Sequence, residues 1–311
     1  MLTVNLIREF FKKKMPKFSK KMLSSIYVTS MTTLKICIII GGMSKTLFLN
    51  GISACYGKNM VLKNVSVCVK AGELTCLCGP NGCGKSTLLS ILAGVQNEGL
   101  SVLKGTGGGS VTSMHIQKDN IDALTLKKLP RKKAAQIVSF MQQNEYSTWD
   151  FTVRELVLQG RFCHTKNGFY TAKDEQLADQ ALAELQIAQL ADRPVHSLSG
   201  GEFQKARIAR AICQGADFIL LDEPAANLDF VYEPWLMKKL SSLAHEKGFG
   251  ILMSVHDVNL AAAYTDNLIL LPLLAAPVCG KINEVLNKQN LNLTYGMEFE
   301  CQKVNYFQSL L

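Results

Sequence analysis

The stretch Gly79–Thr87 constrains the fold of this chain more than any other feature of its sequence. It reads Gly-Pro-Asn-Gly-Cys-Gly-Lys-Ser-Thr and fits the pattern G-x-x-x-x-G-K-[ST]. Residues 74–78 before it predict a short buried strand, and residues 87–93 after it predict a helix. Glycines let backbone N–H groups turn toward phosphate oxygens, and a helix N-terminus adds its dipole to the same anion site. The stretch therefore predicts a phosphate-binding loop between a strand and a helix.

All residues of this loop are candidate contacts to a nucleotide: Gly79, Pro80, Asn81, Gly82, Cys83, Gly84, Lys85, Ser86 and Thr87. We expect Lys85 to reach the β- and γ-phosphates of ATP and the Ser86 hydroxyl to bind Mg²⁺. Upstream, Tyr56 either stacks its ring on the adenine or is an ordinary turn residue. Cys83 either fills space in the loop or, when oxidised, blocks the nucleotide.

The positive charge of the chain lies mostly in its first residues. The 311 residues carry a net charge of +9, and residues 1–42 hold eight basic side chains against Glu9 alone, which leaves +2 for the rest. We therefore assign the basicity to the leader and expect residues 43–311 to lack a basic binding face. Ten cysteines without a C-x-x-C pair indicate reduced thiols in a cytosolic protein.

Three interpretations of the basic extension 1–42 stay open. Translation begins at Met43, or the segment is a disordered or membrane-surface tail, or it is a targeting signal. The apolar residues 36–40 are far shorter than the ~20 residues that span a bilayer.

Two predicted strands end in residues suited to phosphate chemistry. Residues 218–224 predict a buried strand that ends in Asp222 and Glu223, and residues 251–255 predict another that ends in His256. Asp222 is expected to hold Mg²⁺, and Glu223 to orient the attacking water as the general base.

A second candidate anion site lies in residues 198–202, which read Leu-Ser-Gly-Gly-Glu. Ser199, Gly200 and Gly201 precede a helix predicted at residues 203–213, so that a hydroxyl and free N–H groups would point off its N-terminus. One nucleotide does not easily use both anion sites of one chain. We therefore expect two subunits to share each nucleotide.

The chain resembles the ATP-binding subunits of ABC transporters, from about Leu47 to the C-terminus. The resemblance is carried by the motifs above, by residues 62–67 and by Gly72-Glu73. It implies an α/β fold: a P-loop NTPase (ABC ATPase) core over residues 43–311, with an antiparallel β-subdomain and a helical subdomain at about 144–205. The glycine-rich stretch 99–109 is expected to be a loop insertion.

The resemblance also implies roles for individual residues. Gln143 would orient water and touch Mg²⁺, although the residue before it lacks the usual proline and Gln142 stays an alternative. His256 would contact the γ-phosphate and Asp229 would lie in the turn between subunits. Ser199, Gly200 and Gly201 would bind the γ-phosphate of ATP held by the other subunit. The family therefore implies ATP, Mg²⁺ and a head-to-tail homodimer.

The partners expected from this family are an integral-membrane permease on another chain and, indirectly, a substrate-binding protein, at the cytoplasmic face of the inner membrane. No nucleic-acid partner is expected. Residues 152–157, 228–230 and 256–261 look most like importers of iron–siderophore, haem or cobalamin complexes. Zinc or manganese import is the closest rival. Two alternatives belong to other classes of protein. A non-transport ABC ATPase of DNA repair or of the ribosome usually carries two ATPase cassettes or a long coiled coil. A P-loop kinase needs a phosphoryl acceptor site.

Overall fold

The computed structural model describes residues 45–95, 97–104, 120–143, 150–226, 229 and 231–300. Several features predicted from the sequence lie wholly or partly outside these residues: the extension 1–42, positions 105–109 of the glycine-rich stretch 99–109, and the neighbours of Asp229 at positions 227, 228 and 230. The description below therefore concerns the unit that begins at Lys45.

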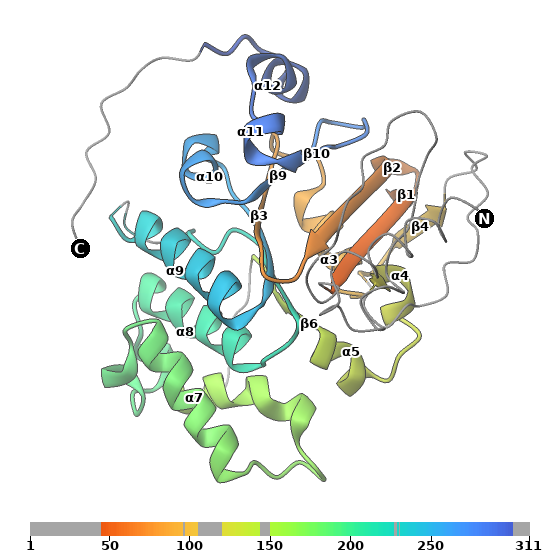
Figure 1. Ribbon diagram of the computed structural model, residues 1–311. Coiled ribbons are helices and arrows are strands. Elements are labelled where there is room, and N and C mark those ends of the chain that lie inside the picture. Colours follow the sequence, from red (N-terminus) through yellow and green to blue (C-terminus); the bar gives the residue numbers. More distant parts are fainter. Residues whose placement is uncertain are drawn as a thin grey trace, which may run out of the picture. The chain divides into compact units, whose positions relative to one another are not determined.

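A six-stranded sheet forms the core, in the order β10-β9-β3-β8-β7-β6 (Figure 1). Its strands are β3 (Leu74–Cys78), β6 (Val138–Met141), β7 (Phe218–Leu221), β8 (Gly250–Ser254), β9 (Asn267–Leu270) and β10 (Val278–Lys281). All neighbours pair in parallel except β9 and β10, which are antiparallel. The strand predicted at residues 74–78 is confirmed to the residue.

The two faces of this sheet are covered by different layers. Successive side chains of a strand point to opposite faces, so Leu77, Leu220 and Leu252 pack on one side while Leu221 and Met253 pack on the other. The first side meets α3 (Lys85–Leu92) and the β-subdomain. The second side meets α8 (Gly200–Cys213) and α9 (Tyr232–Lys247), which lie along the strands in Figure 1. Both faces are buried, which explains why the core strands are almost wholly apolar.

An antiparallel β-subdomain lies against the first face. It is built from β1 (Thr46–Tyr56), β2 (Asn59–Lys70) and β4 (Leu100–Lys104), with the short β5 (Asn120–Asp122) parallel to the start of β1. β1 and β2 are joined by a tight hairpin turn, in which Gly57 has φ +56°. The predicted architecture, an α/β core with an antiparallel β-subdomain, is confirmed.

The remaining helices are α4 (Ala123–Leu126), α5 (Arg131–Ile137), α6 (Val153–Leu158), α7 (Ala172–Glu184), α10 (Val258–Tyr264), α11 (Ile282–Val285) and α12 (Lys288–Tyr295), with 3-10 turns at Gln159–His164, Ala188–Leu190 and Val195–Ser197. α6, α7 and α8 pack on one another in the region where a helical subdomain is expected. Among the helices that the structure describes, none is both long enough and apolar enough to cross a bilayer.

A buried ion pair stabilises this helical region. Arg161 Nε donates to Asp174 Oδ1 at 2.9 Å, and Arg161 also donates to the carbonyls of Cys213 and Gln214 at the end of α8. Asp174 additionally accepts the Thr171 amide and hydroxyl in a capping box at the start of α7. Burial raises the pKa of Asp174, but the hydrogen bonds from Thr171 and the ion pair outweigh it and lower the pKa to about 2.

Because the folded pKa of Asp174 lies below its unfolded value, the ion pair contributes its full stability above about pH 4 and loses it as the pH falls toward 2. We expect Asp174→Asn to lower the free energy of unfolding at pH 7 by about 2 kcal/mol or more. The deficit should shrink as the pH approaches 2. Urea titrations of both proteins from pH 7 to pH 3 measure it, with the exposed Asp192→Asn as the control. A deficit that is independent of pH would contradict this assignment.

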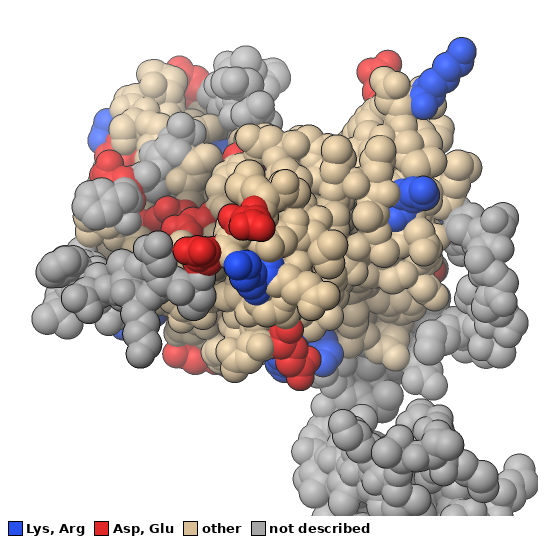
Figure 2. Space-filling view, turned by 90° about the horizontal axis from the view of Figure 1, so that it is seen from above, with Lys and Arg blue, Asp and Glu red and all other residues tan. Residues whose placement is uncertain are grey.

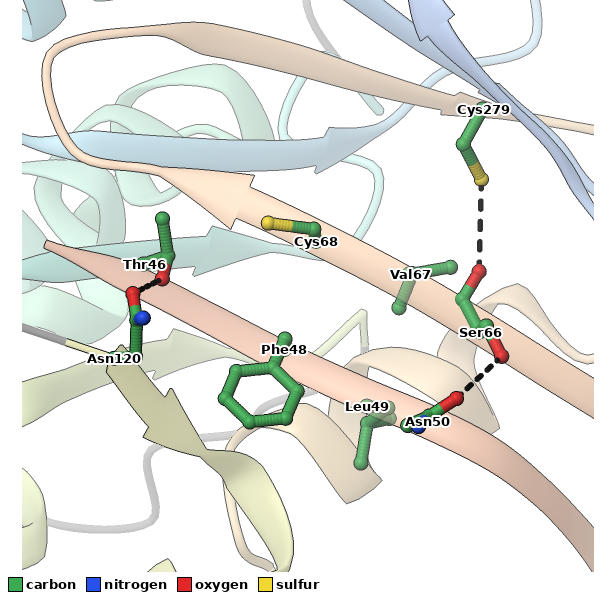
Figure 3. Close-up of a pocket in the computed structure, with 9 residues that line it drawn as sticks. All are labelled: Thr46, Phe48, Leu49, Asn50, Ser66, Val67, Cys68, Asn120 and Cys279. Atoms are coloured by element: carbon green, nitrogen blue, oxygen red, sulfur yellow. Dashed lines mark hydrogen bonds between the residues drawn. The ribbon is translucent and has the colours of Figure 1, made fainter. Parts of the chain in front are cut away.

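A cavity of about 420 Å³ lies on the β-subdomain, between β1, β2, β5 and β10 (Figure 3). It is mostly apolar, with Phe48, Leu49 and Val67 among its lining residues. Its polar groups bond to one another or to backbone: Ser66 Oγ donates to Asn50 Oδ1, and the Cys279 thiol faces the Ser66 carbonyl. No charged side chain lines it. It therefore offers no anion site and is separate from the phosphate loop.

Candidate active site

The phosphate loop connects the end of β3 to the start of α3, as the motif requires. α3 begins at Lys85, two residues before the predicted start, because Gly84 at φ +99° is the left-handed residue that turns the chain into the helix. A Cβ at Gly84 would lie 2.7 Å from the Leu62 side chain, and one at Gly79 would lie 2.4 Å from the Leu271 carbonyl oxygen. Both positions therefore require glycine.

The ammonium group of Lys85 lies inside the loop. Lys85 is 7% exposed, and its Nζ donates to the carbonyls of Gly79 at 2.9 Å and Pro80 at 3.2 Å. Two acceptors leave one of the three donors of the ammonium group for a further oxygen. The loop thus holds a buried cation beside its own backbone N–H groups, which is the chemistry of a phosphate site.

A cavity of about 520 Å³ opens at this loop and joins distant parts of the chain. Its lining residues are Val61, Asn81, Gly82, Gly84, Lys85, Ser86, Thr87, Gln143, Glu223 and His256. Sequence reasoning had proposed all of these as site residues except Val61, which belongs to the apolar surface of β2 and carries no signal of its own. Tertiary structure therefore brings the three separate polar residues to the phosphate loop.

Glu223 joins the other two polar residues of the cavity. Its Oε2 accepts a hydrogen bond from Gln143 Nε2 at 2.6 Å, and its Oε1 lies 2.7 Å from His256 Nε2. Glu223 is largely buried, with 18% of its side chain exposed, whereas His256 is 56% exposed. Gln143, and not Gln142, thus lies against the carboxylate.

The backbone of Glu223 is held in an uncommon conformation. It has φ +48°, which is costly for a residue with a Cβ. Its amide donates to the buried Ser254 Oγ at 2.7 Å, and the same hydroxyl donates to Asp222 Oδ1 at 2.7 Å. Ser254 lies at the end of β8, beside β7. One hydroxyl therefore fixes the positions of both acidic residues, and sequence reasoning missed it because a serine in a buried strand carries no motif.

A polar brace ties α8 to the same residues. Gln204 Nε2 donates to the carbonyls of Glu223 at 3.3 Å and Pro224 at 3.0 Å, and Gln204 Oε1 accepts from Arg207 at 2.8 Å. Arg207, which is 3% exposed, also donates to the carbonyls of Gln142 and Gln143. α8 thus holds both strand ends that carry Gln143 and Glu223.

The second candidate anion site differs from its prediction. Ser199 is the N-cap, and α8 already begins at Gly200, so that the two glycines form its first turn and do not precede it. The Ser199 hydroxyl is not free: it and the Ser199 amide donate to Glu202 at 2.9 and 2.8 Å, and the hydroxyl accepts the Glu202 amide. The expectation overlooked this capping box, in which Ser199 and Glu202 satisfy one another.

Some predicted residues lie away from the cavity lining. The Tyr56 hydroxyl accepts from Asn97 Nδ2 at 3.1 Å, and Asp229 accepts the Tyr232 and Glu233 amides through its carbonyl at the start of α9. Cys83 is 1% exposed in the core, and burial raises the pKa of its thiol. Asp222 is 2% exposed and is not among the residues that line the cavity. In the described part of the chain, no cluster of three His, Cys, Asp or Glu side chains is arranged to hold a metal.

Comparison with known proteins agrees with this geometry. Residues 62–226 match the family described as ABC transporter. The petrobactin import ATP-binding protein FpuD of Bacillus anthracis is 32% identical over 261 residues, which cover 84% of this chain and 89% of that protein. The ferric enterobactin transport ATP-binding protein FepC of Escherichia coli is 34% identical over 245 residues, covering 78% and 84%.

A solved structure of a metal-chelate type ABC transporter in an inward-facing conformation is also similar, with a TM-score of 0.67 and 26% identity. The match covers 86% of this chain and 94% of that one. The chain belongs to the ABC transporter family. It is an ATP-binding subunit, an ABC transporter ATPase, related to the ATPases of siderophore and cobalamin importers.

Proposed function

We propose that the chain hydrolyses ATP, with Mg²⁺, to drive an importer of iron–siderophore or related metal–chelate complexes. The observation that carries the catalytic part is the position of Glu223 between Gln143 and His256 in a cavity that also contains the phosphate loop. The cargo is supported by relatives named for petrobactin and ferric enterobactin transport. Cobalamin is an alternative cargo, because one relative is named for cobalamin import. Haem is a further alternative, which rests on the sequence resemblance alone.

In the proposed reaction, Glu223 is the general base that orients the attacking water toward the γ-phosphate. Gln143 and His256 each contact one oxygen of this carboxylate, so that the two contacts define its plane. Lys85 and the amides of the phosphate loop, from Gly79 to Thr87, would hold the β- and γ-phosphates. The contacts from Gln143 and His256 would help to position the base for the reaction.

The residues at the cavity fit Mg²⁺. Ser86 and Gln143 offer hard oxygen donors in the lining, and the buried Asp222 precedes Glu223 at the end of the same strand. When bound with ATP, Mg²⁺ would neutralise phosphate charge. Asp222, fixed by Ser254, would hold it directly or through water.

We further propose a head-to-tail homodimer that shares two ATP molecules. Ser199, Gly200 and Gly201 lie outside the cavity that holds the phosphate loop of their own chain, which supports a role toward the partner's nucleotide. For that role the Ser199 hydroxyl would have to exchange its contact with Glu202 for a phosphate oxygen. Asp229 would lie near the subunit boundary. Tyr56 would stack its ring on the adenine, and its hydroxyl contact with Asn97 does not use a ring face.

The permease and its substrate-binding protein would be separate chains, and the ATPase would be peripheral at the cytoplasmic face of the inner membrane. Zinc or manganese import is the nearest alternative within the family. A non-transport role in DNA repair or on the ribosome is the alternative outside transport. A pull-down of Glu223→Gln with ATP from detergent-solubilised membranes separates these functions. A many-helix permease supports transport, and its companion substrate-binding protein would distinguish the cargoes. Ribosomal or DNA-bound partners alone would refute transport.

Ser254 offers a test of the proposed chemistry that leaves every cavity residue intact. We expect Ser254→Ala to lower kcat for ATP hydrolysis about tenfold, because the Glu223 amide loses its buried acceptor. The KM for ATP should change less than twofold, since no phosphate contact is removed. Ser254→Thr, which keeps the hydroxyl, should retain more activity, and the partly exposed Ser242→Ala on α9 is the matched control. An equal loss in Ser254→Thr, or a change in KM alone, would refute a positioning role.

A further inference from the structure

A short polybasic run stands out among the described residues. Residues 127–133, between α4 and the first turn of α5, read Lys-Lys-Leu-Pro-Arg-Lys-Lys, and all seven are exposed. The expectation that residues 43–311 lack a basic face was drawn from their net charge, which conceals this run. We define the basic patch as this run together with Lys166.

Lys166 lies beside the basic run, because Lys132 of the run contacts the residue that precedes Lys166. Lys132 Nζ donates to the Thr165 carbonyl at 3.1 Å and lies 4.9 Å from the centre of the Phe162 ring. Lys166 follows Thr165 and forms an isolated bridge with Phe169. The loop before α7 thus lies beside α5, so that the cations of both segments belong to one surface.

No acidic side chain neutralises this surface within its own segments. Residues 123–141 and 156–173 contain no aspartate or glutamate. The acids at their borders are engaged elsewhere: Asp122 accepts the Leu124 amide as the cap of α4, and Asp174 is buried against Arg161. No ion pair involves the basic patch among the described residues. In contrast, the face seen from above in Figure 2 shows basic side chains that are few and scattered.

Exposed apolar side chains lie within the same surface. Phe169 is 78% exposed, Phe162 is 52% exposed and Leu129, inside the basic run, is 36% exposed. The adjoining loop residues Asn167 and Gly168 have positive φ, which places Phe169 in a tight turn. Aromatic rings that project beside lysines are the composition of a surface that meets the interface of a bilayer.

We propose that the basic patch, together with Phe169, binds the anionic surface of a lipid bilayer directly. This inference rests on the membrane location proposed above. Clusters of four to eight basic residues bind anionic lipids, each contributing about a fivefold factor in partitioning (about 1 kcal/mol). The headgroup phosphates would meet the six cations, and Phe169 and Leu129 would enter the boundary between headgroups and acyl chains. The contact would orient the subunit at the membrane beside its permease.

The surface suits a bilayer better than a nucleic acid. Base stacking needs a free ring face, and one face of Phe162 is covered by the Lys132 ammonium group. Leu129 and Pro130 interrupt the basic run with apolar groups that make no favourable contact to a phosphodiester chain. An acidic protein segment would pair with the cations but would not account for the exposure of Phe169.

The test is sedimentation of the full chain with protein-free vesicles of phosphatidylglycerol and phosphatidylcholine, and with vesicles of phosphatidylcholine alone. The test variant carries Lys128→Gln, Arg131→Gln and Lys133→Gln, three exposed residues that form no ion pair with other described residues. The control carries Lys63→Gln, Lys238→Gln and Lys288→Gln, which remove the same charge from β2, α9 and α12. We expect the test variant to partition into anionic vesicles at least tenfold more weakly than the control.

A separate variant, Phe169→Ala, should weaken partitioning without altering its dependence on salt, whereas the loss of the three cations should reduce that dependence. The proposal is overturned if test and control variants partition equally, if the natural chain binds no anionic vesicles, or if a single-stranded RNA competes more strongly than the vesicles. If the permease copurifies but vesicles do not bind, this inference alone fails. If vesicles bind but no permease copurifies, the proposed function fails.

Discussion

Replacing Glu223 with glutamine is expected to slow ATP hydrolysis at least a hundredfold while ATP still binds. A general base contributes about 10²- to 10⁴-fold to a rate, and the amide of glutamine has no basic oxygen of comparable strength. The replacement keeps the size of the side chain and an oxygen that can still accept from Gln143. Because the phosphate loop is unchanged, the variant should accumulate as an ATP-bound dimer.

Release of phosphate and the mass of the ATP-bound species by size-exclusion chromatography measure this result. The matched control is Glu246→Gln on the exposed side of α9, which should behave like the natural chain. A Glu223→Gln chain that hydrolyses ATP at the natural rate would exclude Glu223 as the base. A chain that binds ATP without dimerising would instead refute the head-to-tail pair.

Replacing Lys85 with alanine is expected to weaken ATP binding itself, by about a hundredfold. Hydrogen bonds to charged groups contribute about 1.5–3 kcal/mol each, and the ammonium group is the single cation in the described lining of the cavity. The carbonyls of Gly79 and Pro80 also lose their shared donor, so the empty loop should become less ordered. Lys85→Arg is not expected to restore binding, because a planar guanidinium does not fit a site built around a point charge.

Equilibrium binding of a fluorescent ATP analogue separates this prediction from the first. Lys85→Ala should lose binding, whereas Glu223→Gln should lose only hydrolysis. Lys58→Ala, in the exposed turn between β1 and β2, is the control for loss of a lysine. If Lys85→Ala and the control bound the ATP analogue with equal affinity, the backbone amides of the loop would be sufficient for ATP binding, which would contradict the prediction.

The sequence predicted correctly those parts of the fold that depend on residues close together along the chain. The apolar residues 74–78 and the glycines after them required a strand and a phosphate loop, and both are present. The predicted start of α8 was less accurate, because side chains that bond to the backbone decide it. α8 begins at Gly200, and not at residue 203, because Ser199 and Glu202 cap it. Capping boxes are visible in sequence, so this error was avoidable.

The sequence by itself determined which residues are chemically competent: the phosphate loop, Asp222, Glu223 and His256 are recognisable from residue type and spacing. Only the tertiary structure decided how they act together, because residues 80 or 33 positions apart meet through parallel strand pairing that spacing does not encode. In the tertiary structure Gln143, and not Gln142, contacts Glu223, and Ser254 contacts both Asp222 and Glu223. The same fold brings Lys166 beside the basic run. The net charge of a chain does not say where its charged side chains lie, whereas a binding surface depends on which of them share one face of the folded protein.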